Sequence, residues 1–226
     1  MNFEFDNNKV YLCGVVDSQP TFSHEIYGEG FYDTTLRVKR LSMQEDIIPI
    51  TISERLIAEK NLVVGKKLAI RGQFRSYNKL VENKSKLMLT VFVREIVPEM
   101  EGENTNIIEL VGYICKEPIY RTTPFKREIC DLLLAVNRAY NKSDYLPCIA
   151  WGRSARFISG VSVGEKLFIS GRIQSREYQK KLEDGQTETR TAYEVSISRV
   201  STKEENNQSL LNQIYETPNS MATVNE

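Results

Sequence analysis

The sequence predicts an all-β protein made of two tandem five-stranded barrels. The first observation is a duplication: the strand-like runs 8–16 and 106–114 each hold a glycine near their end, and a proline follows six positions later. An offset of 98 relates these and later pairs: Gly14/Gly112, Pro20/Pro118, Leu36/Leu134, Val38/Val136, Arg40/Arg138 and Pro49/Pro147. The offset becomes 99 at Gly65/Gly164 and Gly72/Gly171. A nearly constant offset with one single-residue insertion indicates two copies of one fold.

The order of the apolar runs within each copy is the second observation. Both copies read strand, long strand, strand, short helix, strand, strand, and the strands are rich in Val, Ile and Leu. We expect one helix at Glu54–Asn61, with Ser53 as its N-cap, and the other near Ser154–Ser159. Five strands with a helix between the third and fourth are the plan of the oligonucleotide/oligosaccharide-binding (OB) barrel. Periodicity alone also fits another small barrel.

Changes in composition suggest where the domains end. We expect a first barrel at residues 1–98, a polar linker at 99–106, a second barrel at 107–200 and a disordered tail at 201–226. The linker region is polar and contains glycine, and the tail is rich in Asn, Gln, Ser, Thr and Glu.

Charge and composition narrow the possible functions. The net charge is zero, but residues 1–98 carry 14 Lys and Arg against 12 Asp and Glu, and residues 201–226 carry 1 against 4. The folded halves are therefore mildly basic, and any binding of a polyanion depends on local patches. The four cysteines lie in apolar runs without CxxC spacing, which suggests buried free thiols, and we expect no metal or other cofactor. With neither a signal peptide nor a membrane span in the sequence, we expect a cytoplasmic protein.

The third strand of the second copy divides its residues between two faces. Alternation places Leu146, Cys148 and Ala150 in the barrel and Tyr145 and Trp151 outside. On the fourth strand, which we expect to adjoin the third, the outward residues are Arg172, Gln174, Arg176 and Tyr178. Bases stack on such rings for about 1–3 kcal/mol each, and arginines neutralise the backbone between them.

Two points leave this interpretation open. Tyr140 shares its parity with the inward Leu134 and Val136, so it reaches the outer face only through a bulge or a loop. The exposed rings also fit a cap on the barrel or a dimer interface, where aromatic residues are enriched.

Four segments of the second copy resemble the bacterial single-stranded-DNA-binding protein family. They are LAVNRAY (134–140), YLPCIAWGRSA (145–155), VGEKLFISGRIQSREY (163–178) and the strand 193–200. The resemblance implies that Tyr140, Tyr145, Trp151 and Tyr178 are the rings that stack with bases. The predicted DNA-binding set of this barrel is completed by Arg138, Arg153, Arg172, Gln174 and Arg176.

The first copy lacks most of these rings. Ile47, Thr51 and Ser53 stand where the second copy has Tyr145, Ile149 and Trp151, and Ser42 replaces Tyr140. Its fourth strand still points Arg71, Gln73, Arg75 and Tyr77 outward, and we expect Lys79, Lys84 and Lys86 in the following loop. We therefore predict that the first barrel, with Arg71, Arg75 and Tyr77, contributes contacts to the DNA backbone and the geometry of the oligomer, with weaker base stacking. The stretch Tyr27–Tyr32 is either a flexible aromatic loop or a plain hairpin.

The sequence thus predicts sequence-tolerant binding of single-stranded DNA in replication, recombination or repair. No Walker A, G-x-S-x-G or HExxH motif is found, so we expect a binding protein without enzymatic activity and without a small-molecule substrate. The alternative is an OB-fold adaptor of the primosome or recombination machinery with weak DNA affinity. The resemblance implies four barrels per assembly, hence a homodimer. The chain closes with PNSMATVNE, whereas the family usually ends in an acidic Pro-Phe tip, so recruitment of replication or repair proteins is in doubt.

Overall fold

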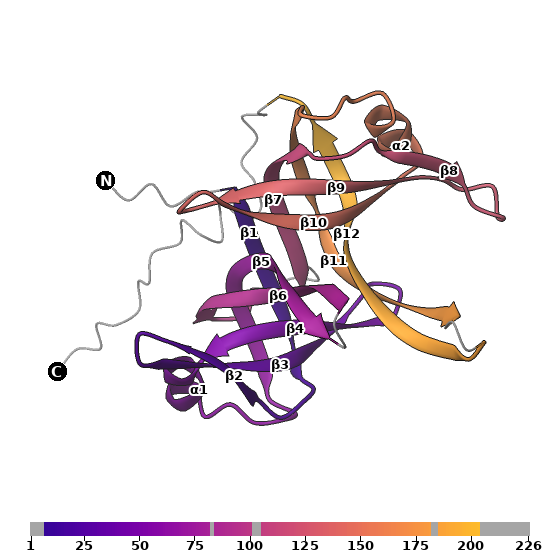
Figure 1. Ribbon diagram of the computed structural model, residues 1–226. Helices are drawn as coiled ribbons and strands as arrows, with labels where there is room; N and C mark the ends of the chain where they lie inside the picture. Colours follow the sequence, from indigo (N-terminus) through magenta and orange to yellow (C-terminus); the bar gives the residue numbers. More distant parts are fainter. Residues whose placement is uncertain (1–6, 82–83, 101–104, 182–184, 204–226) are drawn as a thin grey trace.

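The computed structural model describes residues 7–81, 84–100, 105–181 and 185–203, and it contains two barrels that meet along one strand of each (Figure 1). The elements of the first are β1 (Asn8–Val16), β2 (Thr21–Ile26), β3 (Glu29–Lys39), β4 (Glu45–Ser53), α1 (Glu54–Lys60), β5 (Lys67–Val81) and β6 (Lys84–Val97). Those of the second are β7 (Asn106–Ile114), β8 (Ile119–Thr122), β9 (Glu128–Arg138), β10 (Lys142–Trp151), α2 (Gly152–Ile158), β11 (Lys166–Lys181) and β12 (Thr187–Ser201). In the described ranges, neither short helix has the length and apolarity that a membrane crossing needs.

Five strands of each copy close into a barrel. In the first barrel the order is β1–β3–β4–β6–β5, and β5 pairs again with β1; in the second it is β7–β9–β10–β12–β11, and β11 returns to β7. The pairs β4–β6 and β10–β12 are parallel and the others antiparallel. With a helix between the third and fourth barrel strands, this is the OB fold, which confirms the predicted fold class.

The sequence prediction missed one short strand in each copy. β2 pairs with β3, and β8 pairs with β9, so both extend a barrel sheet at its rim. Every residue of β2 and β8 is exposed, so neither strand shows the apolar alternation that marks a half-buried strand. β2 and β3 form a hairpin whose turn residues, Tyr27 and Gly28, have φ of 52° and 82°. Tyr27–Tyr32 is therefore the plain hairpin of the two alternatives.

The helices lie close to their predicted positions. α1 follows Ser53, which occupies the N-cap position without a side-chain hydrogen bond. α2 begins at Gly152, two residues before the prediction, directly after Trp151. Gly152 has a φ of 52°, which side chains rarely tolerate and glycine adopts freely, so the chain turns from strand to helix at this point.

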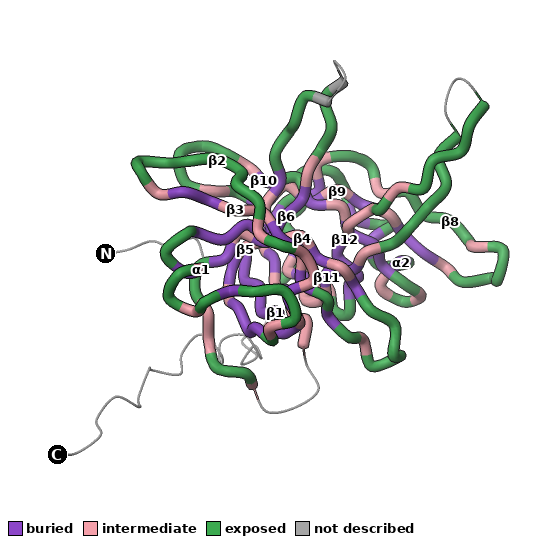
Figure 2. Tube along the Cα trace, turned by 90° about the horizontal axis from the view of Figure 1, so that it is seen from below, coloured by how far each residue is buried: buried purple, intermediate pink, exposed green. Residues whose placement is uncertain are grey.

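Alternate strand residues fill the barrel interiors, and Figure 2 shows the buried positions along the strands and the exposed ones at the hairpin tips. The duplicated glycines Gly72 and Gly171 have a structural cause. A Cβ at either position would lie closer than 3.0 Å to a backbone oxygen of the paired strand, Phe92 O or Ser196 O. Both glycines adjoin a β-bulge, so both copies need the same close approach of two backbones.

The two barrels are joined by antiparallel pairing of β1 with β7, from Asn8↔Leu110 to Leu12↔Asn106. All twelve strands thereby form one hydrogen-bonded sheet. Asn106 belongs to β7 and not to the linker. The described linker residues also contact the first barrel, since Met100 N donates to Tyr11 Oη at 3.0 Å and Cys13 N donates to Thr105 O at 2.8 Å. The predicted tail from residue 204 onward lies outside the described residues, and the domain boundaries stay a prediction.

Two buried aspartates make a second, pseudo-symmetric contact between the barrels. Asp46 Oδ1 of β4 accepts from Ser175 N of β11 at 2.7 Å, and Asp144 Oδ1 of β10 accepts from Ser76 N of β5 at 2.7 Å. The serine hydroxyls accept from the backbone amides that follow the aspartates, Ile47 N at 3.0 Å and Tyr145 N at 2.7 Å, and Ser175 Oγ also donates to Asp46 Oδ1 at 3.4 Å. Hence β11 lies against β4, and β10 against β5 (Figure 1).

Candidate nucleic-acid interface

The four predicted stacking rings of the second barrel are all exposed. Their exposed fractions are 94% for Tyr140, 46% for Tyr145, 40% for Trp151 and 38% for Tyr178. Tyr145 and Trp151 lie on the outer face of β10, whose inward residues Leu146, Cys148 and Ala150 are buried, as alternation predicted. Exposed aromatic rings are suited to stacking with a planar partner.

Tyr140 reaches the surface through the turn between β9 and β10. β9 ends at Arg138, which pairs with Lys142, so Tyr140 lies between the strands. Its φ is 61° and that of Asn141 is 55°. The loop alternative is therefore the one observed, and the parity that assigned Tyr140 to the interior does not apply beyond the end of the strand.

The prediction that the third and fourth barrel strands adjoin is wrong. β12 lies between β10 and β11, because Ser196 of β12 pairs with Ile149 on one side and with Arg172 on the other. Sequence order did not show this, since β12 is the last strand of the barrel and reaches its place by a crossover. Small residues of β12, including Ser196 and Ser198, separate the rings of β10 from the residues of β11.

Two of the predicted cations of this barrel are exposed. Arg153 lies on α2, two residues after Trp151. The Arg176 guanidinium lies over the Tyr178 ring at 5.9 Å, and its Nε is 3.6 Å from Glu194 Oε1. Arg176 therefore stands beside a predicted stacking ring, where a phosphate next to a stacked base would lie.

Arg138, Arg172 and Gln174 lie at the contact between the barrels. Arg138 Nε is 3.6 Å from Asp144 Oδ2, and Arg172 Nη1 is 3.5 Å from Asp46 Oδ2. Gln174 was expected to point into solvent, but it is buried: its Nε2 donates to Glu194 Oε1 at 2.7 Å, and its Oε1 accepts from Arg172 Nη2 at 3.0 Å. Its outward parity is correct, but the neighbouring barrel and Glu194 cover that face.

A cavity of about 300 Å³ opens beside Arg172. It is lined by Lys39, Arg40, Leu41 and Ser42 of the first barrel, Thr105 of the linker, Asn106 of β7 and Arg172 of β11. Arg40 is already bound to Asp46 through Nε at 2.7 Å. The cavity therefore has a cationic lining at the place where the barrels meet.

The first-barrel candidates are less free. Arg71 Nη1 lies 3.2 Å from Glu95 Oε1, and Tyr77 is exposed on β5. The Arg75 guanidinium lies 4.1 Å from the centre of the Phe92 ring, and burial, together with Arg94 and Arg138, lowers its pKa to about 10. We expected Lys79, Lys84 and Lys86 in a loop, and this is wrong. Lys79 of β5 pairs with Lys86 of β6, and Lys84 is the first residue of β6.

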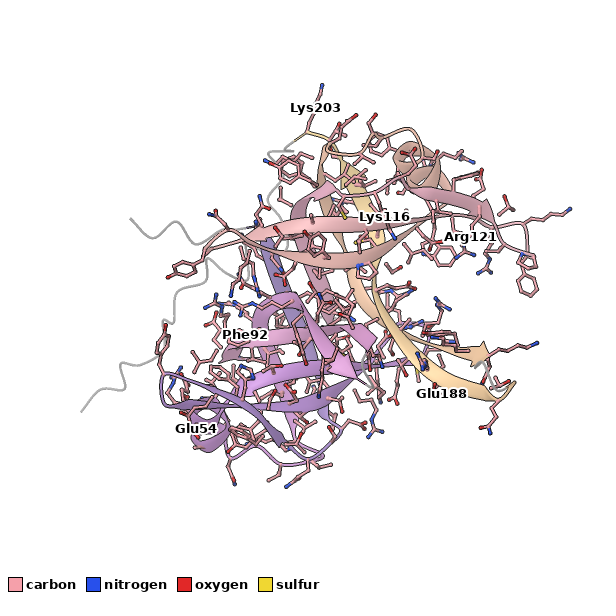
Figure 3. All side chains as sticks on the ribbon, in the orientation of Figure 1. Glu54, Phe92, Lys116, Arg121, Glu188 and Lys203 are labelled. Atoms are coloured by element: carbon pink, nitrogen blue, oxygen red, sulfur yellow. The ribbon has the colours of Figure 1, made fainter. Side chains whose placement is uncertain are left out.

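One group of rings escaped the sequence analysis. His24 of β2, Phe31 of β3 and Phe92 of β6 lie in succession on the first barrel, next to Arg75 and Arg94 (Phe92 is labelled in Figure 3). The analysis compared only positions equivalent to the rings of the second barrel. The available signal was the outward parity of both rings: Phe92 lies between the buried Val91 and Val93, and Phe31 shares its parity with Arg37 rather than with the buried Leu36.

Metal-ligand and thiol chemistry find little support in the described part of the chain. It contains no group of three or more His, Cys, Asp or Glu residues that could hold a metal ion. All four cysteines are free; Cys13, Cys130 and Cys148 are buried and Cys115 is half-buried. Burial raises the pKa of each thiol, which makes the thiolate scarce at neutral pH.

Comparison with known proteins adds two findings. The model of the single-strand binding protein family matches residues 105–202. The single-stranded DNA-binding protein 1 of Staphylococcus aureus (strain COL) is 34% identical over 83 residues, which cover 34% of this chain and 50% of that protein. That of Clostridium tetani is also 34% identical over 83 residues, covering 34% and 57%. The chain thus spans about half the length of the curated relatives that it matches.

Solved structures extend the likeness to both barrels. The wild-type single-stranded DNA binding protein from Thermus aquaticus has a TM-score of 0.65 and 23% identity, covering 89% of this chain and 95% of that one. At this identity the match supports the tandem fold. A dimeric N-terminal domain of PriB from Thermoanaerobacter tencongensis is 49% identical, with a TM-score of 0.35, and covers 41% of this chain and 98% of its own.

Proposed function

We propose that the chain binds single-stranded DNA without strong sequence preference, because residues 105–202 match the model of the single-strand binding protein family. Tyr140, Tyr145, Trp151 and Tyr178 stack with bases, and neighbouring arginines neutralise phosphates. The observation that carries the proposal is that all four rings are exposed on the barrel that matches the family. An adaptor with weak DNA affinity has no need of four such rings, and this disfavours that alternative.

The proposal includes a role and an assembly. Binding protects single strands during replication, recombination or repair in the cytoplasm, and the protein acts by binding alone. A homodimer would supply the four barrels implied by the family resemblance. A mass of twice the 26.0 kDa of the chain, measured by light scattering, would support the homodimer. Recruitment of replication or repair proteins stays a prediction.

Trp151 provides the direct test, because it is the only tryptophan in the chain. Titration with oligo(dT) should quench its fluorescence strongly, since the base stacks on the indole ring. Rising salt should weaken the binding, because counterions compete with phosphate contacts. Unchanged fluorescence together with no gel shift at low salt would refute the proposal.

A nuclease control separates binding from catalysis. Labelled single strands incubated with the protein and Mg²⁺ should stay intact. Progressive cleavage that survives repurification would show that the protein is an enzyme.

A further inference from the structure

The ring cluster of the first barrel comprises His24, Phe31, Phe92, Arg75 and Arg94, and it forms a continuous stack. His24 and Phe31 are parallel, with centroids 5.2 Å apart and an interplanar angle of 12°, and Phe31 and Phe92 are 5.4 Å apart at 33°. The guanidinium of Arg75 lies 4.1 Å from the Phe92 centroid and that of Arg94 lies 5.7 Å from it. Phe31 is buried within the stack, Phe92 is half-buried, and His24 and Arg94 are exposed.

The strand register shows that both barrels have an aromatic ring in the equivalent cross-strand pair, but on different strands of that pair. Phe31 of β3 pairs with Ser53 of β4, whereas Ile129 of β9 pairs with Trp151 of β10. In the first barrel the aromatic residue of this pair is therefore on β3, whereas in the second barrel it is on β10. A comparison of equivalent sequence positions shows only that Ser53 replaces Trp151, and it misses Phe31, which pairs with Ser53.

The other members of the ring cluster have no counterpart in the second barrel. Phe92 pairs with Gln73 and Ser196 with the equivalent Arg172, so a serine stands where the first barrel has Phe92. By the same register, Ser198 stands where the first barrel has Arg94. The ring cluster is thus specific to the first barrel and differs from the ring surface of the second barrel.

The charges around the ring cluster favour an anionic ligand. Arg75 Nη2 and Arg94 Nη2 both donate to Gln73 Oε1, at 2.9 and 3.2 Å, which is a neutral acceptor. The charges of Arg94 and Arg138 lower the pKa of Arg75, and that of Asp144 raises it. Guanidinium groups beside aromatic faces suit a phosphate next to a stacked base.

The ring cluster adjoins the second barrel's rings through the contact between the barrels. Arg75 precedes Ser76, and Ser76 Oγ accepts from the backbone N of Tyr145 at 2.7 Å. The charges of Arg138 and Asp144 of the second barrel act on Arg75, so Arg75 lies close to the contact between the barrels. A single strand that occupies both surfaces would cross this contact.

We propose that the ring cluster is a second base-stacking site, in which unpaired bases stack on His24 and on the Phe92–Arg94 end while phosphates bind Arg75 and Arg94. The buried Phe31 holds the stack in place. This inference rests on the proposed binding of single-stranded DNA and assigns the first barrel its own bases, beyond backbone contacts alone.

The test compares oligo(dT) of two lengths on the full chain. About 8 nucleotides fit one OB fold, which holds roughly 4–16, whereas about 25 nucleotides span both. The variants are His24→Ala and Arg94→Ser, the latter introducing the residue type of the second barrel; both side chains are exposed, so the fold should persist. Arg55→Ala is the matched control, since this exposed arginine of α1 pairs with Glu29 and is not a member of the ring cluster.

The wild-type chain should gain affinity with the longer strand. Each variant should bind the 25-nucleotide strand about fivefold or more weakly than wild type, which is the lower end of the range for one stacked base. Its binding of the 8-nucleotide strand and the quenching of Trp151 should be unchanged. Arg55→Ala should match wild type. Ultraviolet cross-linking of 25-nucleotide oligo(dT) should label peptides containing His24 or Phe92.

Two results would overturn the inference, and they differ in what else they affect. If the variants bind the longer strand as wild type does and no cross-link maps to the first barrel, the ring cluster is not a stacking site, while the proposed function stands. If wild type binds neither length, both proposals fail together.

Discussion

Asp144 is a buried carboxyl whose titration should influence folding. Its Oδ1 accepts from Ser76 N, but Oδ2 has no hydrogen-bond partner and Arg138 lies only at 3.6 Å. Burial outweighs these contacts and raises the pKa of Asp144 above its ordinary 3.8. The folded chain therefore keeps this proton to higher pH than the unfolded chain. The stability contributed by Asp144 falls as the pH rises from the pKa of the unfolded chain through the higher pKa of the folded chain.

Asp144→Asn tests this directly, because asparagine keeps the Oδ1 acceptor and carries no charge. The stability of the variant relative to wild type should increase from about pH 3.5 to pH 7, since only wild type ionises a buried group. Urea unfolding at several pH values measures the difference, and the other carboxyls cancel between the two proteins. A difference that stays flat or reverses sign contradicts the expectation.

Single rings should differ in their value for DNA binding. Trp151→Ala and Tyr178→Ala should each weaken oligo(dT) binding by about 1–3 kcal/mol, the range for one stacked base. Tyr77→Ala should cost less, because its barrel has Ser42, Ile47 and Ser53 at the positions of Tyr140, Tyr145 and Trp151. Fluorescence anisotropy with a labelled oligonucleotide measures all three, with circular dichroism as the folding control. Equal losses would refute the asymmetry between these positions.

At the scale of elements, the sequence predicted what repeats and alternates. The duplicated glycines, the apolar runs and the short helices define two OB barrels, because these features follow from local geometry and core filling. β2 and β8 were missed because their residues are all exposed. The place of β12 between β10 and β11 depends on a crossover, which no local pattern encodes.

The candidate site was predicted in part for the same reason. Parity identified the outward positions of β10 and β11, but outward is not the same as exposed, as the buried Gln174 shows. The first barrel covers part of the second, and that burial arises only from tertiary contacts. The ring cluster was missed because its rings lie on strands other than those used in the second barrel.

Strand β1 carries a side chain that continues a backbone ladder. Beyond Val10↔Gly72, Asn8 Nδ2 donates to Phe74 O at 2.7 Å, and its Oδ1 accepts from Phe74 N at 2.9 Å. Asn106 of β7 makes the same pair with Ile173, at 2.7 and 2.9 Å. The asparagine side-chain amide thus takes the place of one backbone peptide group in the ladder, at the end of β1 or β7 where the strand backbone pairs with the other barrel.

Asn8→Ala should destabilise the fold by about 1–3 kcal/mol or more, because it leaves a buried N–H and a buried C=O of Phe74 unsatisfied. Asn106→Ala should cost less, since Asn106 is only half-buried and water can replace its amide. Urea unfolding of both variants at pH 7 measures the comparison. A larger cost at Asn106 would show that burial does not control the loss.

The whole molecule should unfold as one unit, although it contains two barrels. β1 pairs with β3, β5 and β7, so the strand that closes the first barrel also binds the second. The buried aspartates add side-chain contacts on both sides of this pairing. The buried apolar residues of both barrels form one contiguous cluster. Loss of one barrel would therefore expose apolar surface and unpaired backbone groups on the other.

Calorimetry of the full chain should show one transition, with equal calorimetric and van't Hoff enthalpies. Phe74→Ala in the first barrel and Leu134→Ala in the second each remove a fully buried side chain, at a cost of about 2–5 kcal/mol. Both variants should lower the temperature of that single transition without dividing it. Two transitions, each shifted by only one of the variants, would show that the barrels fold independently and that the β1–β7 pairing does not couple them.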